Sequence, residues 1–136
     1  MVIRHTSHAR YDLWYHLVWA TKYRRRVWTH EYGKKRVEQI LKECAAQYDM
    51  KIDRIACLSD HVHMSISAPP RIAPFRMAQI LKSVSTKLLI QEFPWLTTKF
   101  YWGKEIWAQG YFVRSVGPGL TKEQIDRYVL EQSEEV

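Results

Sequence analysis

Apolar side chains recur along this chain with two periods, one of two residues and one of three to four. The two-residue period, rich in aromatic and β-branched residues, is typical of strands. Strands are predicted at residues 11–20, 51–58, 61–67 and 111–116. The pair Ser59 and Asp60 separates the second strand from the third, which indicates a hairpin.

The longer period predicts amphipathic helices at residues 30–48 and 75–93. Pro94 ends the second helix because proline cannot continue the hydrogen-bond ladder. The run from Thr121 to Gln124 fits a capping box and predicts a final helix over residues 121–134. The expected apolar faces of the first two helices are Val37, Ile40, Leu41, Cys44 and Tyr48, and Ala78, Leu81, Val84, Leu88 and Leu89.

The order of these elements is β-α-β-β-α-β-α, and its first six match the split βαβ, or ferredoxin-like, arrangement. We therefore predict one α+β domain over residues 1–136, with an antiparallel sheet and helices on one face. Residues 1–10 are polar and expected to be flexible, and residues 95–110 are irregular and aromatic. The Gly-Pro-Gly run within residues 117–120 indicates a tether to the final helix.

The third predicted strand, at residues 61–67, contains two histidines. Because strand side chains alternate between faces, His61 and His63 share one face, and the apolar residues that alternate with them share the other. The apolar face should meet the helices, which leaves both imidazoles on the open face. Two ordinary surface histidines would give the same pattern, since a metal site needs further ligands. Such partners are best sought in the final helix, where Tyr128 and Gln132 stand four residues apart on one face.

The net charge of the chain indicates what kind of partner it could bind. The 136 residues carry a net charge of +7. Two basic and five acidic side chains leave residues 121–136 at −3, so the first 120 residues hold +10. A basic body with many aromatic rings suits a nucleic acid, although many basic proteins bind none.

The two cysteines, Cys44 and Cys57, lie in apolar patterns and are expected to be buried thiols. No apolar run is long enough to span a membrane, and the N-terminus shows no signal-peptide pattern, so the cytoplasm is the expected location.

At this point the chain resembles a known family, the HUH endonucleases, in its single-tyrosine branch. These are the small transposases of insertion sequences of the 200/605 type. His61-Val62-His63 matches the His-hydrophobic-His motif, and Tyr128 with Gln132 matches the tyrosine helix. The resemblance extends through YHLVWATKYRR, SDHVHMSIS, FRMAQILKSVSTKLL and WAQGYFVRSVG, in this order.

The resemblance implies a DNA transposase that cleaves and rejoins single-stranded DNA. Tyr128 would be the nucleophile and would form a 5′-phosphotyrosine, leaving a free 3′-hydroxyl. His61, His63 and Gln132 would hold one divalent cation, Mg²⁺ or Mn²⁺. The partners would be hairpin ends of a mobile element and a second copy of the chain, with no membrane. An exposed edge strand at 111–116 is a plausible dimer seam.

Further roles are less specific. Candidate contacts to DNA phosphates are Lys22, Arg24, Arg25, Arg26, Lys82 and Lys87, although any of these could be a solvated surface charge. His16, in the first strand, is either structural or a support for the histidine pair, and no general base is evident.

Three alternatives stay open. A ferredoxin-like module could bind single-stranded nucleic acid without cutting it. A domesticated relative could cut a host repeat with the same chemistry. A metal hydrolase would need carboxylates beside the histidines, where Asp60 is adjacent but has the character of a turn residue.

Overall fold

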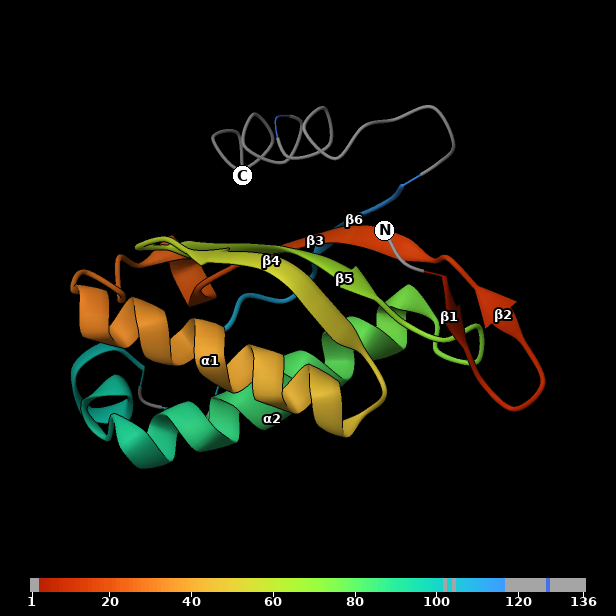
Figure 1. The fold of residues 1–136 in the computed structure, drawn as a ribbon. Coiled ribbons are helices and arrows are strands. Elements are labelled where there is room, and N and C mark those ends of the chain that lie inside the picture. The colour runs from red at the N-terminus through yellow and green to blue at the C-terminus, as the bar shows by residue number, and fades with distance from the viewer. Residues whose placement is uncertain (1–2, 102, 104, 117–126, 128–136) are drawn as a thin grey trace.

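The computed structural model of this chain describes residues 3–101, 103, 105–116 and 127. Its main body is a four-stranded sheet with two helices (Figure 1). The expected tether at 117–120 and the final helix, with Tyr128 and Gln132, lie outside the described residues.

The four long strands form one antiparallel sheet in the order β4-β5-β3-β6. Their bounds are Trp14–Ala20 for β3, Lys51–Cys57 for β4, His61–Ser67 for β5 and Phe112–Ser115 for β6. The first and third of these strands in sequence lie in the centre, and the second and fourth lie at the edges. This is the split βαβ topology, so the predicted α+β, ferredoxin-like fold is confirmed.

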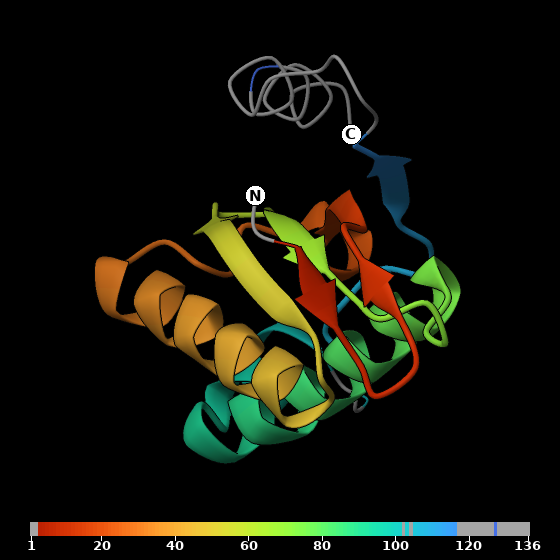
Figure 2. The same cartoon turned by 45° about the vertical axis from the view of Figure 1, so that its right-hand side comes forward.

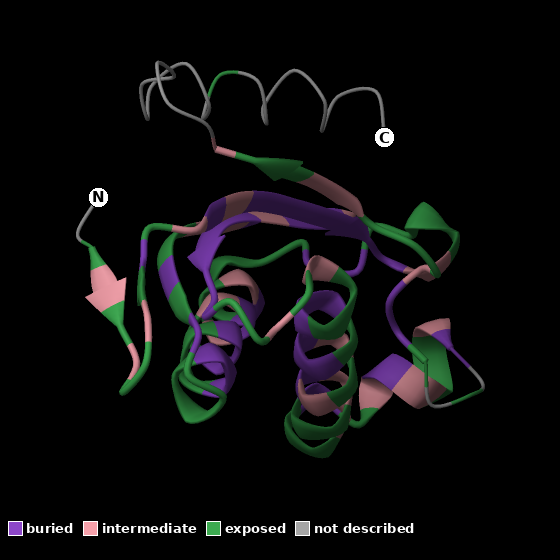
Figure 3. Ribbon diagram, turned by 90° about the vertical axis from the view of Figure 1, so that its right-hand side faces the viewer, coloured by how far each residue is buried: buried purple, intermediate pink, exposed green. Residues whose placement is uncertain are grey.

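Two helices, α1 (Glu31–Gln47) and α2 (Pro74–Glu92), pack side by side against one face of the sheet. The His30 side chain caps α1 by accepting a hydrogen bond from the Gly33 amide at 3.0 Å. Pro74 begins α2, where its missing N–H costs nothing. Figure 3 shows that the burial is concentrated where the helices meet the sheet. Buried residues there include Leu17, Trp19, Val37, Leu41, Val62, Met64, Ile66, Leu81 and Leu89.

The predicted helix faces need two corrections. Leu88 and Tyr48 were expected in the apolar faces but are 40% and 42% exposed. Ser85 is fully buried instead, because its hydroxyl accepts a hydrogen bond from Trp107 Nε1 at 2.9 Å and donates one to the Lys82 carbonyl. The period alone could not identify this residue, since a serine is buried only when such partners exist.

The N-terminal segment, which was expected to be flexible over residues 1–10, forms a small hairpin. Strand β1 (Arg4–His5) pairs antiparallel with β2 (Arg10–Tyr11). Figure 2 shows this hairpin at one end of the main sheet. Arg4 ties it there by donating hydrogen bonds to the carbonyls of Ser67 and Asp49, each at 3.1 Å.

The segment between α2 and β6 returns along the sheet. It begins with a π-helical turn, η2 (Leu96–Phe100), and then bridges Thr21 at Trp107. The Ala108 amide donates to the Ala20 carbonyl at 2.9 Å. This return path covers the start of the loop after β3, where the short helix η1 (Lys22–Arg24) lies.

Both cysteines are buried and free, as predicted. Burial raises the pKa of the Cys44 thiol to about 11 and raises that of Cys57 as well. Among the described residues, no helix is long and apolar enough to cross a membrane.

Candidate metal and DNA site

His61 and His63 lie on the sheet face opposite α1 and α2. The strand register sets them across from Ala20 and Val18 of β3, while Val62 and Met64 between and beside them enter the core. Their rings stack with centroids 6.1 Å apart and an interplanar angle of 25°. The prediction that the two imidazoles share a face is therefore confirmed.

The expected openness of that face is wrong at His61. This histidine is only 6% exposed, while His63 is partly exposed. Strand β5 lies between β3 and β4, so its side chains have neighbours on both sides, and the Asp60 carboxylate is hydrogen-bonded to the His61 ring. A buried imidazole in this position has its orientation fixed by its surroundings.

Asp60 fixes that orientation through a hydrogen bond. Its Oδ1 lies 2.8 Å from His61 Nδ1, and its Oδ2 lies 3.4 Å from the Arg24 guanidinium. Burial of Asp60 opposes its ionisation, but the hydrogen bond from His61 and the positive charge of Arg24 help to hold the pKa of the carboxyl below its usual value. An ionised carboxylate accepts the Nδ1 proton, which leaves the lone pair of the neutral ring on Nε2.

The Nε2 atom of His61 is buried and has no hydrogen-bond partner among the described residues. A buried polar atom without a partner is costly unless a ligand completes it. Histidines that bind metal through one nitrogen usually donate the other to a carboxylate, as His61 does to Asp60. The pair of imidazoles thus fits a divalent cation that accepts nitrogen ligands.

Two nitrogen donors alone do not complete a metal site. Within the described part of the chain, no group of three or more His, Cys, Asp or Glu side chains gathers around one point. Tyr128 and Gln132 lie outside the described residues, so their predicted places beside the histidine pair stay predictions.

The sequence did not identify Asp60 as part of the site. It was interpreted as a turn residue, and it does end the turn between β4 and β5, where the Leu58 amide donates to the His61 carbonyl. Its carboxylate also holds His61. The adjacent Asp and His in the sequence were the available signal, but the contact depends on the turn geometry.

His16 lies on the same sheet face, across from Ser65, and is 2% exposed. It lines a cavity of about 400 Å³ together with His63. The other residues along this cavity are Lys42, Asp53, Arg54, Ile55, Ala56, Met64 and Ser65. His16 is therefore close enough to belong to the surroundings of His63, in line with either predicted role.

Three of the four basic side chains after β3, those of Lys22, Arg24 and Arg25, have hydrogen-bond or ion-pair partners within the protein. Lys22 pairs with Glu105 at 3.4 Å, Arg24 pairs with Asp60, and Arg25 donates to the Phe100 carbonyl. Arg26 is exposed and has no ion pair within the described residues. Arg26 is thus the member of this cluster whose charge has no ion-pair partner among the described residues.

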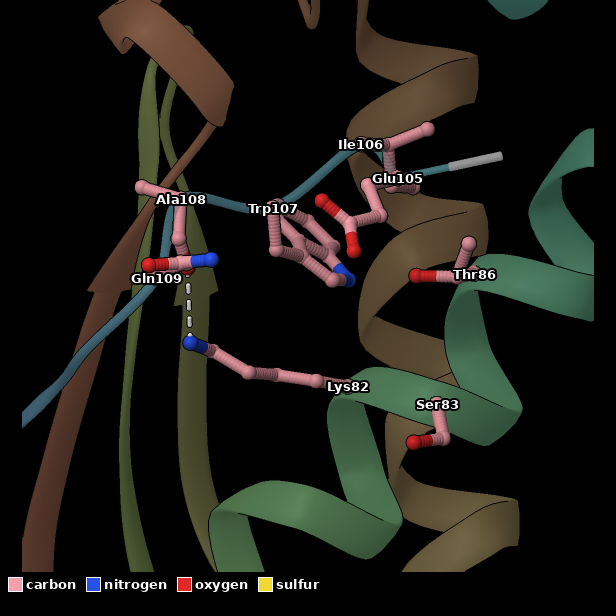
Figure 4. A pocket seen from close by; sticks show the side chains of 8 residues that line it. All are labelled: Lys82, Ser83, Thr86, Glu105, Ile106, Trp107, Ala108 and Gln109. Carbon is pink, nitrogen blue, oxygen red and sulfur yellow. Dashed lines mark hydrogen bonds between the residues drawn. The ribbon is translucent and has the colours of Figure 1, made fainter. Parts of the chain in front are cut away.

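Lys82 points toward the protein, not into solvent (Figure 4). Its Nζ donates to the carbonyls of Ala108 and Gly110 at 2.7 and 2.6 Å and lies 5.9 Å from the Trp19 ring centre. Burial lowers its pKa. These contacts leave one ammonium proton for any phosphate, whereas Lys87 on the same helix is exposed.

The chain is similar to known proteins over most of its length. The family model described as "Transposase IS200 like" matches residues 9–132. The chain belongs to the IS200-like transposase family. It is 35% identical over 131 residues to the IS200 transposase of Salmonella typhimurium, covering 95% of this chain and 82% of that protein. It is 33% identical over 122 residues to the ISDra2 transposase TnpA of Deinococcus radiodurans, covering 90% and 85% of the two chains.

Solved structures extend the family comparison to the fold. A Deinococcus radiodurans protein described as a transposase superposes with a TM-score of 0.74 at 30% identity, covering 95% of this chain and 97% of that one. A REP-associated tyrosine transposase, solved with a REP hairpin bound, superposes with a TM-score of 0.55. Its identity is 15%, with 90% of this chain and 68% of that chain covered, so it supports the fold alone. The predicted family is thereby confirmed.

Proposed function

We propose that this transposase cleaves and rejoins single-stranded DNA through a covalent 5′-phosphotyrosine at Tyr128. One divalent cation, Mg²⁺ or Mn²⁺, would be held by His61, His63 and Gln132. The observation that carries the proposal is the buried His61 Nε2, whose ring is fixed by Asp60 and stacked beside His63. Membership in the family supports the choice of Tyr128 and Gln132.

The proposed ligands suit a site that receives a phosphodiester. When bound, the cation would withdraw charge from the non-bridging oxygens and so lower the barrier to attack by an anionic nucleophile. Two neutral imidazoles and an amide oxygen add no negative charge that would repel the DNA. Mixed nitrogen and oxygen ligands suit Mn²⁺ better than Mg²⁺, which prefers oxygen alone.

A tyrosine nucleophile at Tyr128 would explain how the cleaved DNA strands can be rejoined. Its oxygen would form a bond to phosphorus while the bond from phosphorus to the 3′ oxygen breaks, and that oxygen would leave as a hydroxyl after taking a proton. The phosphotyrosine keeps the energy of the broken bond, so a later 3′-hydroxyl can reverse the step without ATP. A tyrosine is mostly protonated at neutral pH, so its proton must be removed during attack.

We propose DNA hairpins as the substrate, as the resemblance to the single-tyrosine transposases implies and membership in the IS200-like family supports. The exposed Arg26 and Lys87 are available for phosphate contacts, and the net charge of +7 favours a polyanion.

The experiment is incubation with a library of single-stranded DNA hairpins plus Mn²⁺, followed by denaturing electrophoresis. We expect a protein–DNA band that resists denaturation and that disappears in Tyr128→Phe, because phenylalanine keeps the ring and removes the nucleophilic oxygen. Tyr111→Phe, at another exposed tyrosine, is the matched control and should keep the band. A band that persists in Tyr128→Phe would contradict the assignment.

We also propose a homodimer in which the tyrosine helix of one chain can serve the histidine pair of the other. Mixing Tyr128→Phe with the His61→Ala, His63→Ala double mutant tests this, because in a trans heterodimer one complete site remains. Restored cleavage after subunit exchange supports the trans arrangement. Persistent inactivity of proven heterodimers supports a cis enzyme.

The main alternative, a binding module, predicts strand binding with no covalent product under any metal condition. A domesticated relative would form the same adduct, but with a host repeat. Which hairpins in the library react would therefore separate the two biological roles.

A further inference from the structure

An exposed tyrosine beside the candidate site has no role in the proposed chemistry. Tyr23 is 71% exposed, so most of its ring lies in solvent. Its backbone is left-handed, with φ +60°, and that of Arg24 follows with φ +53°. Residues other than glycine seldom adopt this backbone conformation, so the surrounding structure must impose it.

The loop around Tyr23 is anchored on several sides. The Thr21 amide donates to the Asp60 carbonyl at 2.8 Å, and the Thr21 hydroxyl donates to the Arg25 carbonyl at 2.7 Å. The Lys22 amide donates to the Ile106 carbonyl at 2.8 Å. This framework presents Tyr23 outward from a fixed backbone.

Cations hold the ring itself. The Arg25 guanidinium lies 5.2 Å from the centre of the Tyr23 ring and 5.4 Å from that of Tyr101. The Lys22 ammonium lies 5.5 Å from the Tyr23 ring. A surface pocket of about 340 Å³ adjoins them, lined by Lys22, Tyr23, Arg25, Phe100, Tyr101 and Gly103. A flat exposed ring among cations is the combination that proteins use to bind single strands, because bases stack on rings while phosphates meet positive charge.

The loop connects to His61 through Asp60. Arg24, next to Tyr23, contacts the same Asp60 carboxylate that holds His61. A nucleotide against Tyr23 would therefore lie close to a phosphate held at the histidines.

We propose that Tyr23 is a stacking platform for a base of the single strand that enters the candidate site. Its ligand is an unpaired nucleotide near the scissile phosphate, bound through its π face and not through its sequence-specific edge. The inference rests on the proposed function, because it takes the histidine pair as the place where the phosphate binds.

The experiment compares binding of two fluorescent strands to the full chain by anisotropy. One is a thymidine 20-mer, and the other is a 20-mer of abasic sugar phosphates, which keeps the charge and lacks the bases. Tyr23→Leu should weaken binding of the thymidine strand about tenfold, within the range for one stacked base, and leave the abasic strand unchanged. Tyr23→Phe should bind both strands like the unmodified protein.

Tyr32→Leu is the matched control, since Tyr32 is 63% exposed on α1 and should affect neither strand. Melting temperatures of all variants establish that they fold. Equal thymidine binding by Tyr23→Leu and the unmodified protein, or equal losses on both strands, would overturn the stacking role. Because this measurement needs no cleavage, its failure leaves the covalent chemistry intact, and absence of the covalent band leaves the stacking result readable.

Discussion

The two faces of strand β5 use one backbone for two different purposes. Val62, Met64 and Ile66 are at most 1% exposed and pack into the core against the helices. His61 and His63 alternate with them and carry polar atoms on the other face. Because the period of a strand is two, a single register fixes both sets, and packing on one face holds the imidazoles in place on the other. The core residues should therefore matter for stability, and the histidines for chemistry.

Between the two faces of β5, the larger expected effect on cleavage is at the histidine pair. His63→Ala should reduce covalent adduct formation at least about 100-fold, because a lost metal ligand cannot be replaced by water with the same geometry. His63→Ala should change stability little, because His63 is partly exposed. His61→Ala should lower the free energy of unfolding by about 1–2 kcal/mol, because His61 is buried and hydrogen-bonded. Manganese titration calorimetry and thermal melting measure the two effects. Full adduct formation by either variant would show that the pair is not a metal site.

Asp60→Asn should have a smaller effect through His61. The substitution keeps the size of the side chain and removes the charge that fixes the Nδ1 proton, so Mn²⁺ affinity should fall about 10-fold to 100-fold. Calorimetric titration measures this directly. Asp12→Asn, at an exposed position before β3 and outside the cavity beside His63, serves as control for loss of one carboxylate. Unchanged Mn²⁺ affinity in Asp60→Asn would limit Asp60 to a turn role.

On the other face, Met64→Ala should leave adduct formation unchanged at temperatures where the variant is folded. Its side chain is 1% exposed, so the cavity left behind should lower the free energy of unfolding by about 2–5 kcal/mol. Denaturant unfolding followed by circular dichroism measures the loss. If Met64→Ala loses adduct formation while fully folded, the two faces are not separable as described.

The smallest expected effect distinguishes two basic residues. Arg26→Gln should reduce the slope of log affinity for single-stranded DNA against log salt concentration by about one, as for one lost phosphate contact. Lys82→Gln should leave this slope unchanged, because Lys82 Nζ is bonded to the carbonyls of Ala108 and Gly110. Anisotropy at several salt concentrations gives both slopes. A reduced slope in Lys82→Gln would mean that its ammonium group reaches DNA.

The sequence predicted the sheet, both helices and the shared face of the histidines, because these follow from periodicity, which is local. It missed the β1–β2 hairpin, whose two-residue strands are too short to show a period. It also assigned Leu88 to the core and missed Ser85, because the burial of Ser85 depends on Trp107, 22 positions away. The contact between the adjacent residues Asp60 and His61 depends on the geometry of the turn before β5. The inward direction of the Lys82 side chain depends on Ala108 and Gly110, 26 and 28 positions away, so the local pattern around Lys82 could not predict it.

The central claim, that Tyr128 carries the DNA, is tested most directly by mapping the covalent bond. After adduct formation with Mn²⁺, nuclease digestion would trim the DNA and trypsin would cut after Arg127, releasing residues 128–136, a peptide with a single tyrosine. Fragmentation by tandem mass spectrometry should place a nucleotide 5′-phosphate on Tyr128. A nucleotide attached to any other residue, or recovery of peptide 128–136 unmodified from a purified adduct, would contradict the account.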